Sequence, residues 1–329
     1  MQENLKRIIH ASLPPAAVHV LKTSRAAIKV RGARRAFEAA FGGQEYLAPA
    51  RLIDLQWRYP EALPYHYGDE ALFQRGLERK KQLAHFFKIE GSRTLELAGH
   101  DAMVSGLMTR DGAKATMIDL SVDHVNPRAI SFGVAAEAVN AENLPYESGS
   151  FDCVFSYNAF EHFPKPEVVL AEALRVTRPG GILFFSFGPL YRSSYGLHAM
   201  HSITAPFCQF LWGRPVLDAY IEERGLRRIE YETLNEWTIQ QFRDLWARWQ
   251  PWGATEVYRE VPSVHGIDLV TDFPSCFCGK VDRFDDLVVA IIEIAMRRTD
   301  KPMPLIDEAR AVPLASQFLS RSDVLPLHT

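Results

Sequence analysis

The segment from Phe151 to Phe187, FDCVFSYNAFEHFPKPEVVLAEALRVTRPGGILFFSF, contains two apolar runs with a helical pattern between them. Residues 151–157 and 182–188 are short and continuously apolar, which is typical of strands buried on both faces. Residues 166–177 follow helical periodicity and stop at Pro179-Gly180-Gly181. Because such strands alternate with helices in parallel sheets covered on both faces, the segment predicts an α/β fold.

The same alternation extends in both directions along the chain. Toward the N-terminus we expect strands at 94–97 and 114–120, a helix at 102–112, and a short third strand or loop at 138–144. Toward the C-terminus we expect a helix at 238–249, a strand at 254–261 and a long final strand at 284–298. Right-handed crossovers would wind these elements into a Rossmann-like, doubly wound, mostly parallel sheet of about seven strands.

The segments outside this alternation define the expected organisation of the chain. Residues 44–68 are rich in Pro, Tyr and Trp and read as irregular structure, and Asp69 could cap a helix that follows. Residues 189–235 are rich in aromatic residues and His and show no clear βα unit. We expect an N-terminal helical extension (1–88), a cofactor-binding core (89–190), an insert (191–235), the end of the core sheet (236–300) and a C-terminal tail (301–329).

Several short motifs follow one another between residues 140 and 181. They are Asn140-Ala141-Glu142, Leu144-Pro145-Tyr146, Ser150-Phe151-Asp152, Glu161-His162, and Arg175-Val176 through Pro179-Gly180-Gly181. In order and spacing they resemble the class I S-adenosyl-L-methionine (SAM)-dependent methyltransferases, over about residues 90–190 and more weakly to about 300. The resemblance implies a Rossmann-like fold, SAM as methyl donor and S-adenosyl-L-homocysteine (SAH) as product.

The loop after the first expected strand departs from the usual pattern of that family. The family usually has E-x-G-x-G-x-G here, and some members resemble E-L-G-A-H-D-G, whereas this chain reads ELAGHDA from Glu96 to Ala102. Alanine tolerates positive φ poorly and narrows the approach to a ligand. We interpret the loop as a divergent SAM loop.

The resemblance assigns cofactor-binding roles to individual positions. Glu96 and the backbone of Ala98, Gly99, His100 and Asp101 would face the methionine end of SAM. The remaining positions are Asp119 for the ribose, Asn140, Ala141 and Glu142 around the adenine, and Tyr157 and Asn158 beneath the sulfonium. From its position alone, Asp119 could instead cap the next segment.

Methyl transfer needs mainly alignment of nucleophile, methyl group and sulfur, and a hydroxyl acceptor also needs a base. His198 and His201 follow the fifth strand on the expected acceptor side and are candidate bases, or ordinary surface histidines. His162 is a third candidate, although it could instead cap a turn. We expect a small-molecule acceptor, methylated at oxygen rather than at nitrogen or carbon.

We expect no metal site, because His198 and His201 have no carboxylate partner at a convincing spacing. Cys276 and Cys278 form a C-x-C without a second pair, which favours buried thiols over zinc. The aromatic residues of the insert, among them Phe210 and Trp212, could form a lid over the site, pack on the sheet edge, or form a dimer surface.

Composition and charge exclude several classes of protein. The chain has 329 residues, 47% hydrophobic and 23% charged, with a net charge of −3, so nothing global indicates nucleic-acid binding. Four cysteines form no disulfide framework, and no signal peptide or membrane span is evident, so we expect a cytoplasmic protein. Residues 1–35 hold eight Lys or Arg against Glu3, with Lys22, Arg25 and Lys29 at helical spacing. This face could contact an anionic membrane surface weakly, or be merely solvated.

Two other functions are compatible with parts of the sequence. The two alanines of the loop are also consistent with a non-catalytic Rossmann-like binding or scaffold protein. An acid at position 119 would equally suit a nicotinamide enzyme, although the motifs between residues 140 and 181 argue against it.

Overall fold

The chain forms one seven-stranded sheet with the strand order β3-β2-β1-β4-β5-β7-β6. The computed structural model describes residues 15–42, 44–60 and 67–304. The strands are β1 (Arg93–Leu97), β2 (Lys114–Asp119), β3 (Ala135–Ala138), β4 (Phe151–Tyr157), β5 (Thr177–Phe187), β6 (Gly253–Pro262) and β7 (Val289–Arg298). Strands β1 to β5 are parallel, and β7 runs antiparallel to both β5 and β6. The predicted doubly wound, mostly parallel sheet is confirmed.

Helices bury both faces of this sheet. On one face, α7 (Pro166–Val176) and α10 (Ile239–Trp249) pack Leu170, Leu174, Phe242 and Trp246 against the strands. On the other face, α4 (Asp69–Leu83) and α5 (Met103–Arg110) contribute Leu83, Val104 and Met108, while the short α6 (Pro127–Ser131) packs beside α5 through Ala129. The apolar runs in the sequence therefore become strands enclosed between two helical layers.

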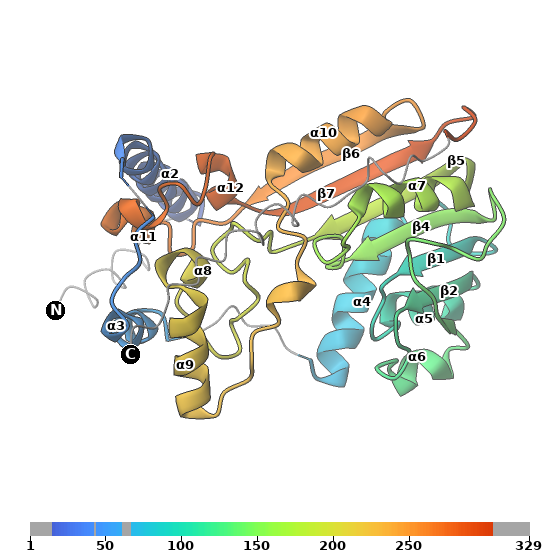
Figure 1. Cartoon of the computed structure of the whole chain (residues 1–329). Helices are drawn as coiled ribbons and strands as arrows, with labels where there is room; N and C mark the ends of the chain where they lie inside the picture. Colours follow the sequence, from blue (N-terminus) through green and yellow to red (C-terminus); the bar gives the residue numbers. More distant parts are fainter. Residues whose placement is uncertain (1–14, 43, 61–66, 305–329) are drawn as a thin grey trace, which may run out of the picture.

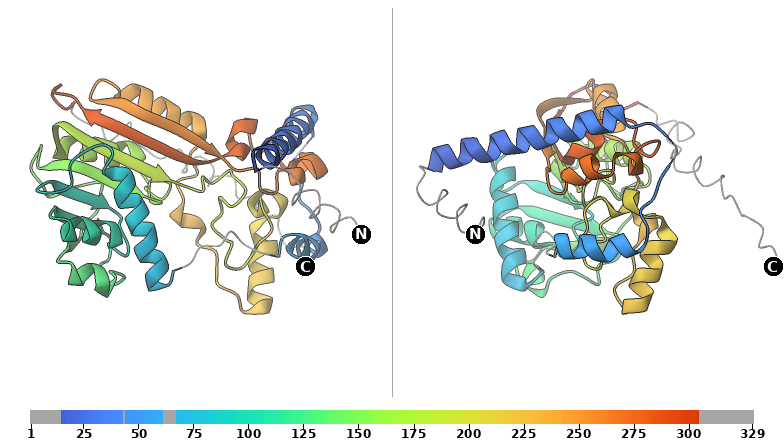
Figure 2. Two further views of the ribbon diagram at one scale, coloured as in Figure 1. Left: turned by 180° about the vertical axis from the view of Figure 1, so that it is seen from behind. Right: turned by 90° about the vertical axis from the view of Figure 1, so that its left-hand side faces the viewer.

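A second, helical lobe lies beside the sheet, and β4 and β5 point toward it (Figure 1). It contains α2 (Pro15–Ala39), α3 (Ala50–Arg58), α8 (Cys208–Leu211), α9 (Arg214–Arg224), α11 (Asp268–Asp272) and α12 (Phe284–Val288), with the 3-10 turns η1 (Tyr231–Thr233) and η2 (Pro274–Cys276). The view from behind shows the same separation of lobe and sheet (Figure 2, left). Ala33, Leu52, Trp212, Leu217 and Leu269 share one buried cluster in this lobe. The N-terminal extension and the insert are thus packed on a common core.

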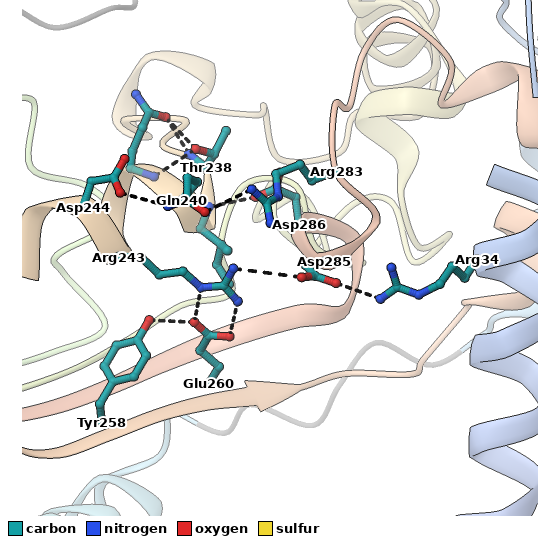
Figure 3. Close-up of polar contacts among 12 residues, drawn as sticks. Arg34, Thr238, Gln240, Arg243, Asp244, Tyr258, Glu260, Arg283, Asp285 and Asp286 are labelled. Atoms are coloured by element: carbon teal, nitrogen blue, oxygen red, sulfur yellow. Dashed lines mark hydrogen bonds and ion pairs between the residues drawn. The ribbon is translucent and has the colours of Figure 1, made fainter. Parts of the chain in front are cut away.

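A chain of polar contacts connects the lobe to α10 and β6 (Figure 3). The Arg243 guanidinium in α10 donates from Nε and Nη2 to the two carboxylate oxygens of Glu260 in β6, over 2.7 and 2.6 Å. Another nitrogen of the guanidinium lies 4.0 Å from Asp285, which also pairs with Arg34 of α2 at 2.8 Å. Figure 3 shows how Asp285 lies between the two arginines.

Four sequence predictions of local structure were wrong or displaced. Residues 50–58 form α3 instead of irregular structure, because Leu52 and Leu55 share a face that is buried in the lobe. The third strand is β3, which overlaps the predicted 138–144 only at Ala138. The segment predicted as the final strand forms α12 and then β7. The N-cap of α4 is Gly68, and Asp69 is the first residue of the helix.

The aromatic residues of the insert are packed in the core, which contradicts the alternative that they form a lid over the site. Phe207, Phe210, Leu211 and Trp212 are at most 4% exposed and belong to the core of the lobe. Trp237 packs on the other cluster, with its ring centroid 5.3 Å from that of Phe242. Burial of their apolar area inside the lobe, rather than closure over a ligand, explains these side chains.

The predictions for the N-terminal helix and for the cysteines are confirmed only in part. Helix α2 includes positions 22, 25 and 29, and the Arg25 and Lys29 side chains are exposed. Contact with an anionic membrane surface stays a prediction. Within the described residues, no helix has the length and apolar character needed to span a bilayer. Cys153, Cys208 and Cys276 are buried, Cys278 is half-buried, and all four are free thiols.

Candidate functional site

A cavity of about 560 Å³ lies where the carboxyl ends of β1, β4 and β5 face the helical lobe. Its size falls in the usual range of small-molecule sites, about 300–1,000 Å³. The sheet side of its lining comes from the loops after β1, β2, β4 and β5, and α4 adds a second wall. The lobe side comes from residues 197–202 and 227–233. The cavity therefore joins the expected cofactor loop to the insert.

The loop after β1 has an unusual backbone. Ala98, His100 and Ala102 have φ values of 50°, 46° and 58°, in the left-handed region that favours glycine. The expectation that the two alanines occupy positions suited to glycine is therefore confirmed. Each such residue costs roughly 1–2 kcal/mol, so the surrounding structure must hold this loop in place.

Gly99 is required for a different reason. A Cβ at this position would lie 2.4 Å from Met117 Cγ and 2.8 Å from Glu96 Cδ. Since carbon atoms in contact are normally about 3.5–4.0 Å apart, no larger residue fits without displacing one of them. The glycine that remains in the loop thus permits the Glu96 carboxyl to occupy its place.

Glu96 is buried at the wall of the cavity, with 3% of its surface exposed. Its Oε2 accepts hydrogen bonds from the Ser105 hydroxyl at 2.6 Å and the Ser105 backbone N–H at 3.2 Å. Burial raises the pKa of Glu96 to about 7, and the Ser105 hydrogen bonds oppose that rise. A cation in the cavity would favour the ionised carboxylate.

Asp119 lies at the end of β2, as predicted, but it is outside the lining of the cavity. Its two carboxylate oxygens accept from the backbone N–H groups of His100 at 3.0 Å and Leu120 at 2.7 Å. The alternative that Asp119 caps the segment after it is therefore observed, and the same carboxylate also fixes the strained loop.

The predicted adenine residues do not line this cavity. Asn140 Oδ1 accepts from the Glu142 backbone N–H at 2.9 Å, and Glu142 lies 3.6 Å from Lys165 Nζ. Ala141 is buried in the core cluster on the α7 face. The structure brings none of these three into contact with the cavity.

Tyr157 and Asn158 line the cavity at the end of β4. The Tyr157 hydroxyl donates across to α4, with the Arg79 carbonyl oxygen at 3.1 Å and Gln82 Oε1 at 3.0 Å. The Arg79 guanidinium lies 4.5 Å from the centre of the Tyr157 ring. Asn158 has a φ of 53° and its N–H donates to the Ser186 carbonyl, so the chain turns sharply into the cavity there.

All three candidate histidines line the cavity, and two of them lie together. The rings of His162 and His198 meet edge to face, with centroids 5.0 Å apart. Burial, and to a smaller extent the nearby His162, lower the pKa of His198 to about 4, so this imidazole is neutral at pH 7. His201 is exposed at the rim and packs against Tyr67, with ring centroids 6.1 Å apart.

Sequence reasoning missed several residues of the cavity. Glu161 was noted only as part of a family motif, yet its carboxyl is buried beside His162 and His198. His124, whose ring stacks on His100 at a centroid distance of 5.0 Å, and Arg75 and Arg79 of α4 also line the wall. No local pattern marks these positions, because the packing of separate elements brings them to the cavity.

Comparison with known proteins identifies the segment that builds the sheet side of the cavity. Residues 95–185, from β1 into β5, match the protein family described as a methyltransferase domain. An uncharacterized methyltransferase of Mycobacterium sp. (strain JLS) is 29% identical over 144 residues, which are 42% of this chain and 53% of that protein. A ubiquinone biosynthesis O-methyltransferase of Xanthomonas oryzae pv. oryzae (strain PXO99A) is 33% identical over 104 residues, 30% of this chain and 44% of that protein.

Other similarities extend further along the chain. The 27-O-demethylrifamycin SV methyltransferase of Amycolatopsis mediterranei (strain S699) is 29% identical over 211 residues, 60% of this chain and 77% of that protein. Among solved structures, a SAM-dependent methyltransferase from Mesorhizobium loti is similar with a TM-score of 0.43 and 18% identity, covering 69% of this chain and 100% of that chain.

The chain spans about half the length of the mycobacterial relative and less than half of the Xanthomonas relative. The family match and the strand order cover the same elements, β1 to β5. The protein contains a class I methyltransferase domain of the SAM-dependent type.

Proposed function

We propose that the protein transfers the methyl group of SAM to a hydroxyl group of a small molecule. The supporting observation is the cavity, which has the loop of residues 96–101 on one side and His162, His198 and His201 on the other. In open α/β sheets, ligands bind outside the carboxyl ends of the strands, which is where this cavity lies.

The cofactor would occupy the sheet side of the cavity. Glu96 would face the ammonium group of the methionine moiety, and the carboxyl becomes ionised when that cation binds. Gly99 would let the backbone approach the ligand. Asp119 would bind the ribose while it holds the loop through His100, and residues 140–142 would flank the adenine beyond the cavity. Tyr157 and Asn158 would lie beneath the sulfonium.

The acceptor would occupy the lobe side. Alignment of the acceptor oxygen, the methyl carbon and the sulfur supplies most of the rate, because the sulfonium is a good leaving group. His198 is neutral at pH 7, and its ring faces that of His162 inside the cavity. A free imidazole nitrogen there can accept the proton of a bound hydroxyl. Two of the similar proteins are named O-methyltransferases, which supports oxygen as the methylated atom.

Isothermal titration calorimetry with SAM, SAH and NAD tests this proposal and separates it from the alternatives. We expect SAM and SAH to bind one per chain and NAD not to bind. No binding of SAM or SAH at millimolar ligand would contradict the proposal and favour a binding or scaffold protein. Methyl-labelled SAM, offered with a panel of hydroxylated small molecules, would then identify the acceptor.

A further inference from the structure

Three side chains from two segments of the chain meet at the wall of the cavity. Glu161 and His162 follow β4, and His198 belongs to the insert after β5. One potential ligand atom from each of them lies within 4.8 Å of the other two, and His162 Nε2 is 3.9 Å from Glu161 Oε1. Among the residues that the structure describes, no other three His, Cys, Asp or Glu side chains come together in this way.

Backbone carbonyls select the tautomer of both imidazoles. His162 Nδ1 lies 2.8 Å from the Thr233 carbonyl oxygen, and His198 Nε2 lies 2.9 Å from the Pro189 carbonyl oxygen. A carbonyl oxygen only accepts, so each of these nitrogens carries the proton and donates it. The lone pairs are therefore on His162 Nε2 and His198 Nδ1. Histidines that bind metals are held in this way, with the other ring nitrogen donating to a carbonyl or a carboxylate.

The Glu161 carboxyl gives independent evidence that a ligand binds at this cluster. Only 2% of its surface is exposed; Oε1 accepts from the Gly188 N–H at 3.0 Å, but the buried Oε2 has no hydrogen-bond partner. A buried carboxylate with an unsatisfied oxygen costs free energy unless a cation or donor meets it.

We propose that Glu161, His162 Nε2 and His198 Nδ1 bind one divalent transition-metal cation of the Zn²⁺ class. Two imidazole nitrogens and one carboxylate oxygen suit such ions better than Mg²⁺ or Ca²⁺, which prefer oxygen ligands. Ligand atoms around a zinc ion lie about 2.0–2.2 Å from the metal, hence roughly 3.3 Å from one another. Small side-chain rotations would bring the three atoms to that spacing and leave a fourth coordination position open.

This inference rests on the proposed function only for the role of the cation. An acceptor hydroxyl at the open position would lose its proton to solvent more readily, since a bound cation lowers its pKa. The oxygen would then form a bond to the methyl carbon of SAM as the carbon–sulfur bond breaks and its electron pair returns to sulfur. With a cation bound, His162 and His198 are ligands, and the cation then replaces the role of base that the proposed function gives to His198, since one lone pair cannot serve both roles.

The direct test is a zinc titration of the full-length protein after treatment with a chelator. Calorimetry with ZnCl₂ should show one site per chain, with a dissociation constant of about 1 µM or lower. Glu161→Gln, which keeps an acceptor for the Gly188 N–H, should weaken zinc binding by at least roughly 100-fold. His162→Ala should do the same, and its partly exposed position makes it the variant that disturbs folding less.

His201→Ala is the matched control, because His201 lines the same cavity but lies outside the cluster. Its zinc affinity should stay within about threefold of the original protein. Zinc binding that survives both Glu161→Gln and His162→Ala, or the absence of any zinc site in the original protein, would overturn the proposal. Thermal unfolding of each variant shows whether a loss of binding reflects a loss of fold.

A parallel SAH titration keeps the two proposals separate. Binding of SAH without binding of zinc would contradict the metal site and leave the proposed function standing. Binding of zinc without binding of SAH would support the metal site and contradict the proposed function.

Discussion

Gly99→Ala is the substitution whose effect the structure defines most sharply. The new methyl carbon would lie 2.4 Å from Met117 Cγ and 2.8 Å from Glu96 Cδ, and both neighbours are at most 3% exposed. Neither can move into solvent without vacating a buried position. Overpacking of this kind costs about 1–3 kcal/mol of folding free energy. If Glu96 is the group displaced, SAH also loses a charge-assisted contact worth about 1.5–3 kcal/mol, or roughly 10- to 100-fold in affinity.

Ala98→Gly is the matched control, since it changes one methyl group at the adjacent position. The φ of 50° at Ala98 favours glycine, so removing the methyl group relieves about 1–2 kcal/mol. Glycine has greater freedom in the unfolded chain, which lowers the free energy of unfolding by about 0.4–1 kcal/mol. The net increase in the free energy of unfolding is therefore about 0.5–1 kcal/mol.

Chemical denaturation measures the free energy of unfolding, and calorimetry measures SAH affinity, for both variants. We expect Gly99→Ala to lower both quantities and Ala98→Gly to raise stability while leaving affinity unchanged. Equal SAH affinity in Gly99→Ala and the original protein would refute the link between Gly99, Glu96 and cofactor binding. Destabilisation by Ala98→Gly would show that the left-handed backbone at this position is not strained.

Three further predictions address the cofactor site, the acceptor site and the join between sheet and lobe. Burial raises the pKa of Glu96 to about 7, and a bound ammonium group favours its ionised form. The SAM affinity measured by calorimetry should therefore rise about tenfold per pH unit from about pH 5 to 7 and then stay constant. Glu96→Gln should abolish this pH dependence. His198→Ala should lower turnover by roughly two to four orders of magnitude in a methyl-transfer assay while SAH affinity stays the same, because it removes the proposed base or, with a cation bound, one of its ligands. A parallel loss of SAH affinity would place His198 on the cofactor side instead. Arg243→Ala should lower the free energy of unfolding by about 1 kcal/mol, because it removes a bidentate ion pair with Glu260. Arg248→Ala breaks the more exposed ion pair with Glu167 and should lower the free energy of unfolding by about half as much or less.

The fold could be predicted from the sequence because the central strands are continuous apolar runs. Strands β1, β4 and β5 are buried over most of their length and β2 over half of it, and hydrophobic pattern alone marks them. The edge strand β3 is mostly exposed and reads AAEA, so it carries no such signal. Helix α9 was missed because only Leu217 and Ile221 of its residues are buried, which leaves a short apolar face.

Part of the candidate site could be predicted, because it lies in loops that directly follow the predicted strands. The loop after β1 and the turn after β4 are fixed by local sequence, and the structure places Glu96, Gly99 and Tyr157 at the cavity. The meeting of Glu161 with His198 depends on how the insert folds back over the end of β5. The expectation that the histidines lack a carboxylate partner therefore considered only neighbours in sequence.

A crystal structure of the protein grown with SAH tests the proposed site most directly. We predict density for SAH in the cavity, with its ammonium group near Glu96 and its sulfur between the loop of residues 98–101 and the side chains of Glu161, His162 and His198. A cavity that stays empty at saturating SAH, or SAH bound at another place on the protein, would contradict the assignment of this cavity as the methyl-transfer site.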